Sequence, residues 1–187
     1  LNENSKIKTT NIDRIANEGV VFTDAHSSSS VSTPSRYSVL TGRYNWRSDL
    51  KSGVLMGYNK ALIAPDRRTI ASVLRDQGYQ TACIGKWHLG WDWNNIEAGP
   101  DSVDFSKPIS NGPTTRGFDY FYGIIASLDM APYVYVENDM PTALPDRVTV
   151  NDGMKYWRKG PAASDFDHEQ TLPNFINRAV DYIHDKS

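Results

Sequence analysis

Residues 69–90 constrain the fold more than any other part of the sequence, because they predict a helix, a strand and a polar loop in direct succession. Thr69 is suited to cap the helix and Gly78 to end it. The apolar residues of the helix follow the i, i+3, i+4 spacing of one face: Ile70, Val73 and Leu74. Residues 79–84 are expected to form a strand, and the polar residues 86–88 follow it. This order is typical of α/β proteins, which bind ligands at the carboxyl ends of strands.

A second informative stretch, Ser32–Arg43, predicts a short helix with polar residues at its start. Pro34 suits the first helical position, and Thr33 is suited to cap it. Arg36 follows Ser32 by four residues and should lie on the same side of the helix. A hydroxyl and a guanidinium at a helix N-terminus suit a tetrahedral oxyanion. The same residues also fit ordinary capping beside a solvated arginine, so this stretch alone leaves both interpretations open.

Length and composition fit one soluble domain. A chain of 187 residues is long enough to bury a sizeable core. Its net charge of −2, with both signs interspersed, gives no basic patch for nucleic acid. No apolar run is long enough to span a membrane. Cys83 is the single cysteine, so no internal disulfide is expected. The chain begins at Leu1 instead of Met, so the absence of a targeting segment carries no information.

The rest of the chain predicts further alternation of helices and strands without a domain boundary. A first helix is expected to begin at a Thr10 cap and to close at Gly19, and a last helix is expected over residues 171–183. Strands are expected at 20–22, 118–125, 133–136 and 148–150. A serine-rich loop at 25–31 leads directly into Ser32. The predicted fold class is therefore α/β.

Two segments together resemble the sulfatase family. Ser32–Arg43 matches the signature C/S-x-P-S-R-x-x-x-x-T-G-R at every fixed position, and Gly78–Gly90 resembles G-Y-x-T-x-x-x-G-K-W-H-x-G. They occur in the family's order. Residues 10–16 and 117–119 also resemble the arylsulfatase branch. The resemblance covers nearly the whole chain but only the N-terminal portion of a sulfatase.

This resemblance implies an alkaline-phosphatase-like fold, here an incomplete three-layer α/β/α sandwich. Residues 1–187 would be the N-terminal part of a single catalytic domain, with the first strand and the C-terminal half absent. The implied activity is hydrolysis of aryl or carbohydrate sulfate monoesters. Such enzymes are periplasmic or secreted, and this chain would act on a sulfated small molecule or glycan.

The implied nucleophile is a formylglycine hydrate. In the family a maturation enzyme oxidises the first residue of the signature, which is Ser32 here. A serine at this position resembles the bacterial branch, although a cysteine replaced by an experimenter would look identical. Arg36 would hold the hydrate, Lys86 would contact sulfate and nucleophile, and His88 would take a proton from the hydrate. Fixed cations suit the charge that develops on sulfuryl oxygens in the transition state.

Positions outside the two signatures are less firmly assigned. Lys86 and His88 are two residues apart, so on an extended segment their side chains would face the same way. Ser127 aligns loosely with a family residue that contacts sulfate, but an ordinary loop serine fits equally well. Asp129 is a weaker candidate for a substrate contact. His26 is interpreted as a structural residue near the site and His168 as a helix-start residue.

The resemblance also implies a cofactor, Ca²⁺, that this chain does not hold by itself. The family's Asp-Asp pair lies upstream of the matched segment, and further ligands come from the C-terminal half. Ca²⁺ takes six or more oxygen ligands, and this chain offers one, the modified Ser32. Residues 1–187 alone are therefore expected to bind no catalytic metal and to turn over little substrate. The absent first strand would also leave a sheet edge unpaired.

Two alternatives to a sulfatase remain open at this point. A phosphomonoester or phosphonate hydrolase of the same superfamily often keeps the nucleophile signature. A non-catalytic protein that binds sulfated glycans on this scaffold would keep Ser32 unmodified.

Overall fold

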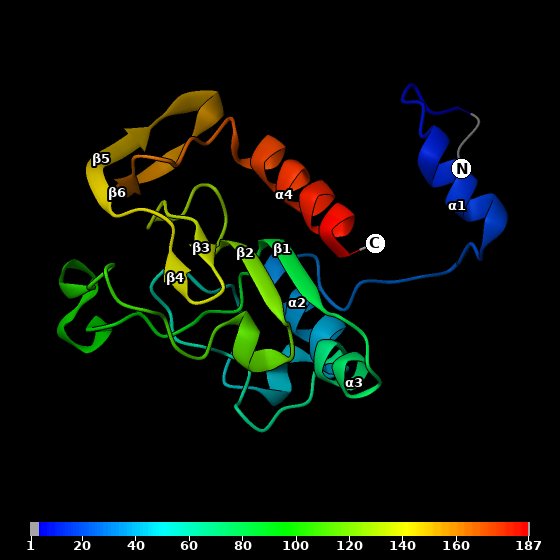
Figure 1. Ribbon diagram of the computed structural model, residues 1–187, viewed down its shortest axis with the longest axis horizontal. Helices are drawn as coiled ribbons and strands as arrows, with labels where there is room; N and C mark the ends of the chain where they lie inside the picture. The colour runs from blue at the N-terminus through cyan, green and yellow to red at the C-terminus, as the bar shows by residue number, and fades with distance from the viewer. Residues whose placement is uncertain (1–3, 187) are drawn as a thin grey trace.

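A four-stranded sheet lies at the centre of the computed structural model, which describes residues 4–186 (Figure 1). The strand order is β1-β2-β3-β4, with bounds Ala82–Lys86, Tyr120–Ile124, Val136–Glu137 and Met140–Pro141. β1 and β2 run parallel, and their register pairs Lys86 with Ile124, whereas the other pairs are antiparallel. The carboxyl ends of β1 and β2 therefore lie side by side, where the polar residues after each strand meet.

Helices cover both faces of this sheet. On one face lie α2, Ser32–Thr41, and α3, Ile70–Asp76, and on the other lies α4, Thr171–Lys186 (Figure 1). Successive residues of a strand point to opposite faces, so Phe121 packs with the tryptophan-rich cluster and Tyr122 packs against Phe175 of α4. The incomplete three-layer α/β/α arrangement predicted from the resemblance is thus confirmed.

α3 and the strand after it show where local sequence decides the structure. The Thr69 hydroxyl accepts the Ser72 amide at 3.1 Å and the Ser72 hydroxyl accepts the Thr69 amide at 2.9 Å, which confirms the predicted cap. The prediction of a strand at 79–84 was wrong by three residues at its start and two at its end. β1 continues through Gly85, whose φ of 126° a glycine tolerates.

The N-terminal arm departs most from prediction. α1, Thr10–Glu18, confirms the first helix, but its N-cap is Thr9 instead of Thr10. The strand predicted at 20–22 is absent: the structure assigns no strand there, and Val20 and Phe22 are 77% and 79% exposed. Its residues have strand-forming side chains, but no neighbouring edge pairs with them in the described chain. The segment instead connects α1, which lies apart from the sheet, to α2 (Figure 1).

The C-terminal third contains a hairpin that the sequence only half predicts. β5, Pro145–Asn151, pairs with β6, Trp157–Ala163, around the turn η5, Gly153–Lys155. A strand was expected at 148–150, but β6 was missed because Gly160 and Pro161 interrupt its strand pattern. Of the strand expected at 133–136, only its last residue belongs to β3. The remaining short helices are η1 Asn45–Arg47, η2 Ile96–Ala98, η3 Pro100–Ser102 and η4 Pro113–Arg116.

Two surfaces of this fold are left without a neighbour among residues 4–186. β1 pairs with β2 alone, so its other edge is open. α4 confirms the predicted last helix and extends three residues beyond it, but much of its apolar stripe is exposed: Leu172, Ile176, Val180 and Ile183. None of the described helices is long and apolar enough to cross a membrane.

Candidate active site

The start of α2 is held by tertiary contacts instead of a local cap. The helix begins at Ser32 with Val31 as its N-cap, so the predictions that Thr33 caps it and that Pro34 is its first residue were wrong. Thr33 is fully buried; its hydroxyl donates to the His88 carbonyl at 3.0 Å and accepts the Leu55 amide at 3.2 Å. The Thr33 hydroxyl gains more by satisfying buried backbone groups than by capping α2, because water or neighbouring groups can satisfy the free amides at a helix start.

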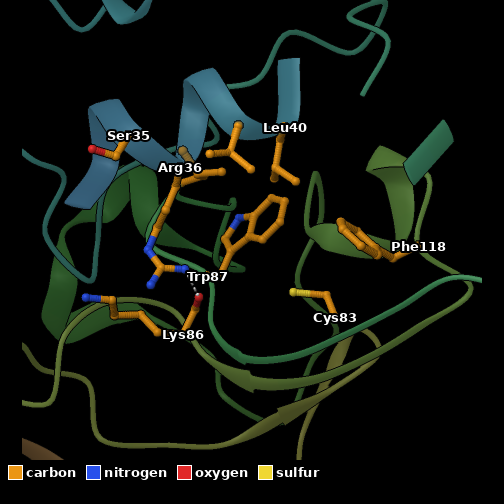
Figure 2. Close-up of a pocket in the computed structure, with 9 residues that line it drawn as sticks. Ser35, Arg36, Leu40, Cys83, Lys86, Trp87 and Phe118 are labelled. Carbon is orange, nitrogen blue, oxygen red and sulfur yellow. Dashed lines mark hydrogen bonds between the residues drawn. The ribbon is translucent and has the colours of Figure 1, made fainter. Parts of the chain in front are cut away.

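Ser32, Arg36 and His88 converge on one oxygen atom. The Arg36 Nε donates to Ser32 Oγ at 2.9 Å, as the four-residue spacing predicted, and His88 Nδ1 lies 2.9 Å from the same oxygen. Arg36 also donates from Nη1 to the Lys86 carbonyl at 2.7 Å, the dashed line in Figure 2. The first helical turn is thereby tied to the end of β1. The two signature segments, separate in sequence, form a single site.

Hydrogen bonds fix the proton of the His88 ring. Nε2 lies 2.7 Å from the Leu55 carbonyl, which only accepts, so Nε2 carries the proton. In the neutral ring Nδ1 is then an acceptor, and it receives the Ser32 hydroxyl hydrogen. Burial lowers the pKa of His88, and the nearby Lys86 and Arg36 charges lower it further, against the raising effect of the Leu55 bond. The ring is therefore a neutral base at neutral pH.

The backbone bends between Lys86 and His88. β1 ends at Lys86, and His88 adopts a left-handed φ of 57°, so the expectation of a segment extended through His88 was wrong. The bend is held by the His88 amide, which donates to the Ile125 carbonyl at 2.7 Å. A non-glycine residue in this region costs on the order of 1–3 kcal/mol, and such strain is typical of functional sites.

Lys86 reaches the loop that follows β2. Its Nζ donates to Ser127 Oγ at 3.2 Å, so Ser127, for which the resemblance implies a sulfate contact, lies beside Lys86. Burial lowers the pKa of the Lys86 ammonium, and Arg36 lowers it further, while Asp129 raises it. Asp129 sits on the same turn as Ser127, because the Met130 amide donates to the Ser127 carbonyl at 2.9 Å.

His26 and His168 are the two other histidines for which the sequence suggested a role. His26 has an exposed side chain that pairs with Asp24 at 3.0 Å, so it does not support the site by packing as expected. His168 does not start a helix, since α4 begins at Thr171; its ring stacks on Trp157 with centroids 3.8 Å apart. Both predictions were wrong because a single histidine outside a motif gives no local pattern from which its contacts can be predicted.

A cavity of about 310 Å³ lies beside the site, between α2 and β1 (Figure 2). Its walls are largely apolar, and Arg36 and Lys86 stand at one end. The other lining residues are Ser35, Val39, Leu40, Cys83, Trp87, Leu89 and Phe118. Burial raises the pKa of the Cys83 thiol to about 11, so this group is not a nucleophile at neutral pH.

The site residues do not match a calcium shell. Ca²⁺ takes oxygen ligands, chiefly carboxylates, but the groups around Ser32 Oγ are a guanidinium and an imidazole. Residues 4–186 contain no group of three or more His, Cys, Asp or Glu side chains that could hold a metal ion. Carboxylate ligands would have to come from other residues of the protein.

Comparison with known proteins agrees with this geometry. The sulfatase family model matches residues 1–185. The chain belongs to the sulfatase family.

Individual relatives and one solved structure give the same result. The chain is 40% identical over 150 residues to an N-acetylgalactosamine-6-O-sulfatase of Bacteroides thetaiotaomicron, covering 79% of this chain and 28% of that protein. It is 42% identical over 126 residues to human steryl-sulfatase, covering 65% of this chain and 20% of that protein. A solved structure described under glycosaminoglycan metabolism by Bacteroides thetaiotaomicron, and labelled 6S-sulf, superposes with a TM-score of 0.76 at 30% identity, covering 95% of this chain and 43% of that one. The chain thus spans less than a third of the length of these two curated relatives.

Proposed function

We propose that residues 1–187 are the N-terminal part of a sulfatase catalytic domain that hydrolyses sulfate monoesters. One observation carries the proposal: Ser32 Oγ lies 2.9 Å from both a fixed guanidinium nitrogen and a neutral imidazole acceptor. Family membership and the open edge of β1, which leaves room for a further strand of the same domain, support it.

Each side chain has a role that its contacts support. Arg36 holds the oxygen at the Ser32 position and supplies positive charge. His88 Nδ1 accepts a proton from that oxygen, because its other nitrogen is committed to Leu55. Lys86 and Ser127 would hold sulfate oxygens, since they pair a cation with a hydroxyl and the charge of Lys86 acts on His88.

The proposal includes a matured residue and a metal. Ser32 would be oxidised to formylglycine by a maturation enzyme, because an unmodified serine is a weak nucleophile. Ca²⁺ would be held by the modified residue and by carboxylates outside residues 4–186. We propose a sulfated glycan as the substrate, with a sulfated aryl compound as the simpler test molecule, and a periplasmic or secreted location. The named activity of the Bacteroides relative supports the glycan.

Intact mass spectrometry of the natively produced protein tests this proposal. Oxidation of Ser32 to formylglycine lowers the mass by about 2 Da. An unchanged mass would instead favour the non-catalytic glycan-binding alternative. Comparing sulfate with phosphate esters on the full-length enzyme separates a sulfatase from a phosphomonoester or phosphonate hydrolase. Residues 1–187 alone are expected to show little turnover, and clear calcium-dependent hydrolysis by them would contradict the assignment of the metal ligands.

A further inference from the structure

The turn that carries Ser127 is fastened to the β5–β6 hairpin at one residue, Arg158 of β6. The Arg158 amide donates to the Asp129 carbonyl at 3.1 Å, and its Nη1 donates to the same carbonyl at 3.1 Å. Nη1 also binds the Asp129 carboxylate. Arg158 therefore holds both the backbone and the side chain of a residue two positions from Ser127.

The hairpin side of this contact is bonded to a buried tyrosine, Tyr133. The carbonyl of Arg158 accepts the Tyr133 hydroxyl at 2.6 Å, and the Tyr133 amide donates to the Pro161 carbonyl at 2.9 Å. Tyr133 is 1% exposed. The buried Tyr133 thus holds the backbone of Arg158 in place. The bonds from Arg158 to Asp129 then hold the turn in place relative to the hairpin.

Asp129 has two cations within electrostatic reach, Arg158 and Lys86. Its carboxylate makes the hydrogen bond to Arg158, and its charge also acts on Lys86. Lys86 instead donates to Ser127. If the guanidinium were removed, the carboxylate would lose its partner and would attract the Lys86 ammonium away from Ser127.

We infer that Arg158 is a positioning residue for sulfate binding. It fixes the Ser127–Met130 turn and occupies the Asp129 carboxylate, so that Lys86 and Ser127 stay available to the sulfate group. This inference rests on the proposed sulfatase function, but neither signature includes Arg158, which is linked to the Ser127 turn through Asp129.

Kinetics of the full-length matured enzyme on an aryl sulfate test the inference. Arg158→Ala is expected to raise KM about tenfold, the equivalent of one charged hydrogen bond, with kcat changed less. Arg158→Lys should recover part of the loss, because an ammonium still neutralises the carboxylate. Adding Asp129→Asn to Arg158→Ala should return KM to within about threefold of the parent enzyme, because it removes the competing charge. Lys159→Ala, which deletes a positive charge one residue along the same strand, is the matched control.

The outcomes separate this inference from the proposed function. An unchanged KM in Arg158→Ala would overturn the inference. A double variant whose KM is as high as that of Arg158→Ala would also overturn it, because Asp129→Asn cannot rescue the loss of a purely structural role. If Arg158→Ala does not fold, Arg158→Lys and its combination with Asp129→Asn decide by the same comparison. A parent enzyme that hydrolyses phosphate esters but no sulfate ester would refute the proposed function itself, and this inference with it.

Discussion

Replacing Thr33 with Val gives the most direct test of how the site is built. The two side chains have nearly the same shape, so the substitution removes a hydroxyl without leaving a large cavity. In the structure that hydroxyl satisfies two backbone groups from distant parts of the chain, the His88 carbonyl and the Leu55 amide. Through this one oxygen atom, Thr33 links α2 to both the His88 segment and the Leu55 segment.

The expected cost follows from the burial of these two groups. The His88 carbonyl is bonded in a buried environment, and leaving such a group without a partner costs about 1–3 kcal/mol. The Leu55 amide is half-buried, and losing its bond adds about 0.5–1.5 kcal/mol. Thr33→Val should therefore lower the free energy of unfolding by about 1.5–4.5 kcal/mol, the sum of these two ranges.

Urea unfolding followed by tryptophan fluorescence measures this change, with Thr41→Val as the control. Thr41 is in the same helix, but its hydroxyl makes local bonds, donating to the Tyr37 carbonyl one turn back and accepting the Arg43 amide two residues on. Neither bond links distant segments, so Thr41→Val should cost less than Thr33→Val. The full-length enzyme should also lose kcat in Thr33→Val, because the Leu55 carbonyl that orients the His88 ring is no longer anchored through its own amide. Equal destabilisation by the two variants would refute the reasoning, since it would show that the long-range bonds contribute nothing beyond a local one.

Three further predictions concern positions that the two signatures leave unspecified or do not include. Cys83, with its pKa raised to about 11, should react with iodoacetamide at pH 8 far more slowly in the native protein than in urea; equal rates would contradict its burial. Gly123→Ala should destabilise by more than about 3 kcal/mol in the same urea assay, because the new Cβ would lie 1.8 Å from the Gly85 carbonyl oxygen, and a loss below about 1 kcal/mol would contradict this packing. Burial lowers the pKa of His168, so the unfolded state binds a proton more readily, and stability should fall as pH drops below about 6.5; His168→Gln should flatten that fall in unfolding measured from pH 7 to 5.

Local signals predicted the parts of this fold that are stabilised locally. The cap at Thr69 and the helix that follows it depend on neighbours a few residues away. The contact between Ser32 and Arg36 belongs to the same class, because helical spacing sets it. Sequence periodicity and turn chemistry report such contacts well.

Contacts between residues far apart in the chain could not be predicted from local sequence patterns. The ring of His88 is oriented by a backbone carbonyl of Leu55, and a carbonyl has no signature in a sequence. Arg158 contacts Asp129, which is 29 residues away in sequence. β6 is a strand because β5 pairs with it, although its own glycine and proline argue against that.

The wrong prediction for residues 20–22 and the exposed stripe of α4 have a common physical cause. In both places the sequence carries a pattern typical of buried structure, yet Phe22 is 79% exposed and Leu172 is 65% exposed. The apolar pattern of a segment indicates which of its faces is suited to burial, but it does not identify the strand or helix that would pack on that face. The open edge of β1 is the backbone counterpart, since its unpaired amides and carbonyls need a neighbouring strand. The open edge of β1 and the exposed face of α4 both border the sheet that carries Lys86, so a strand or helix that covered either of them would also lie close to the candidate site.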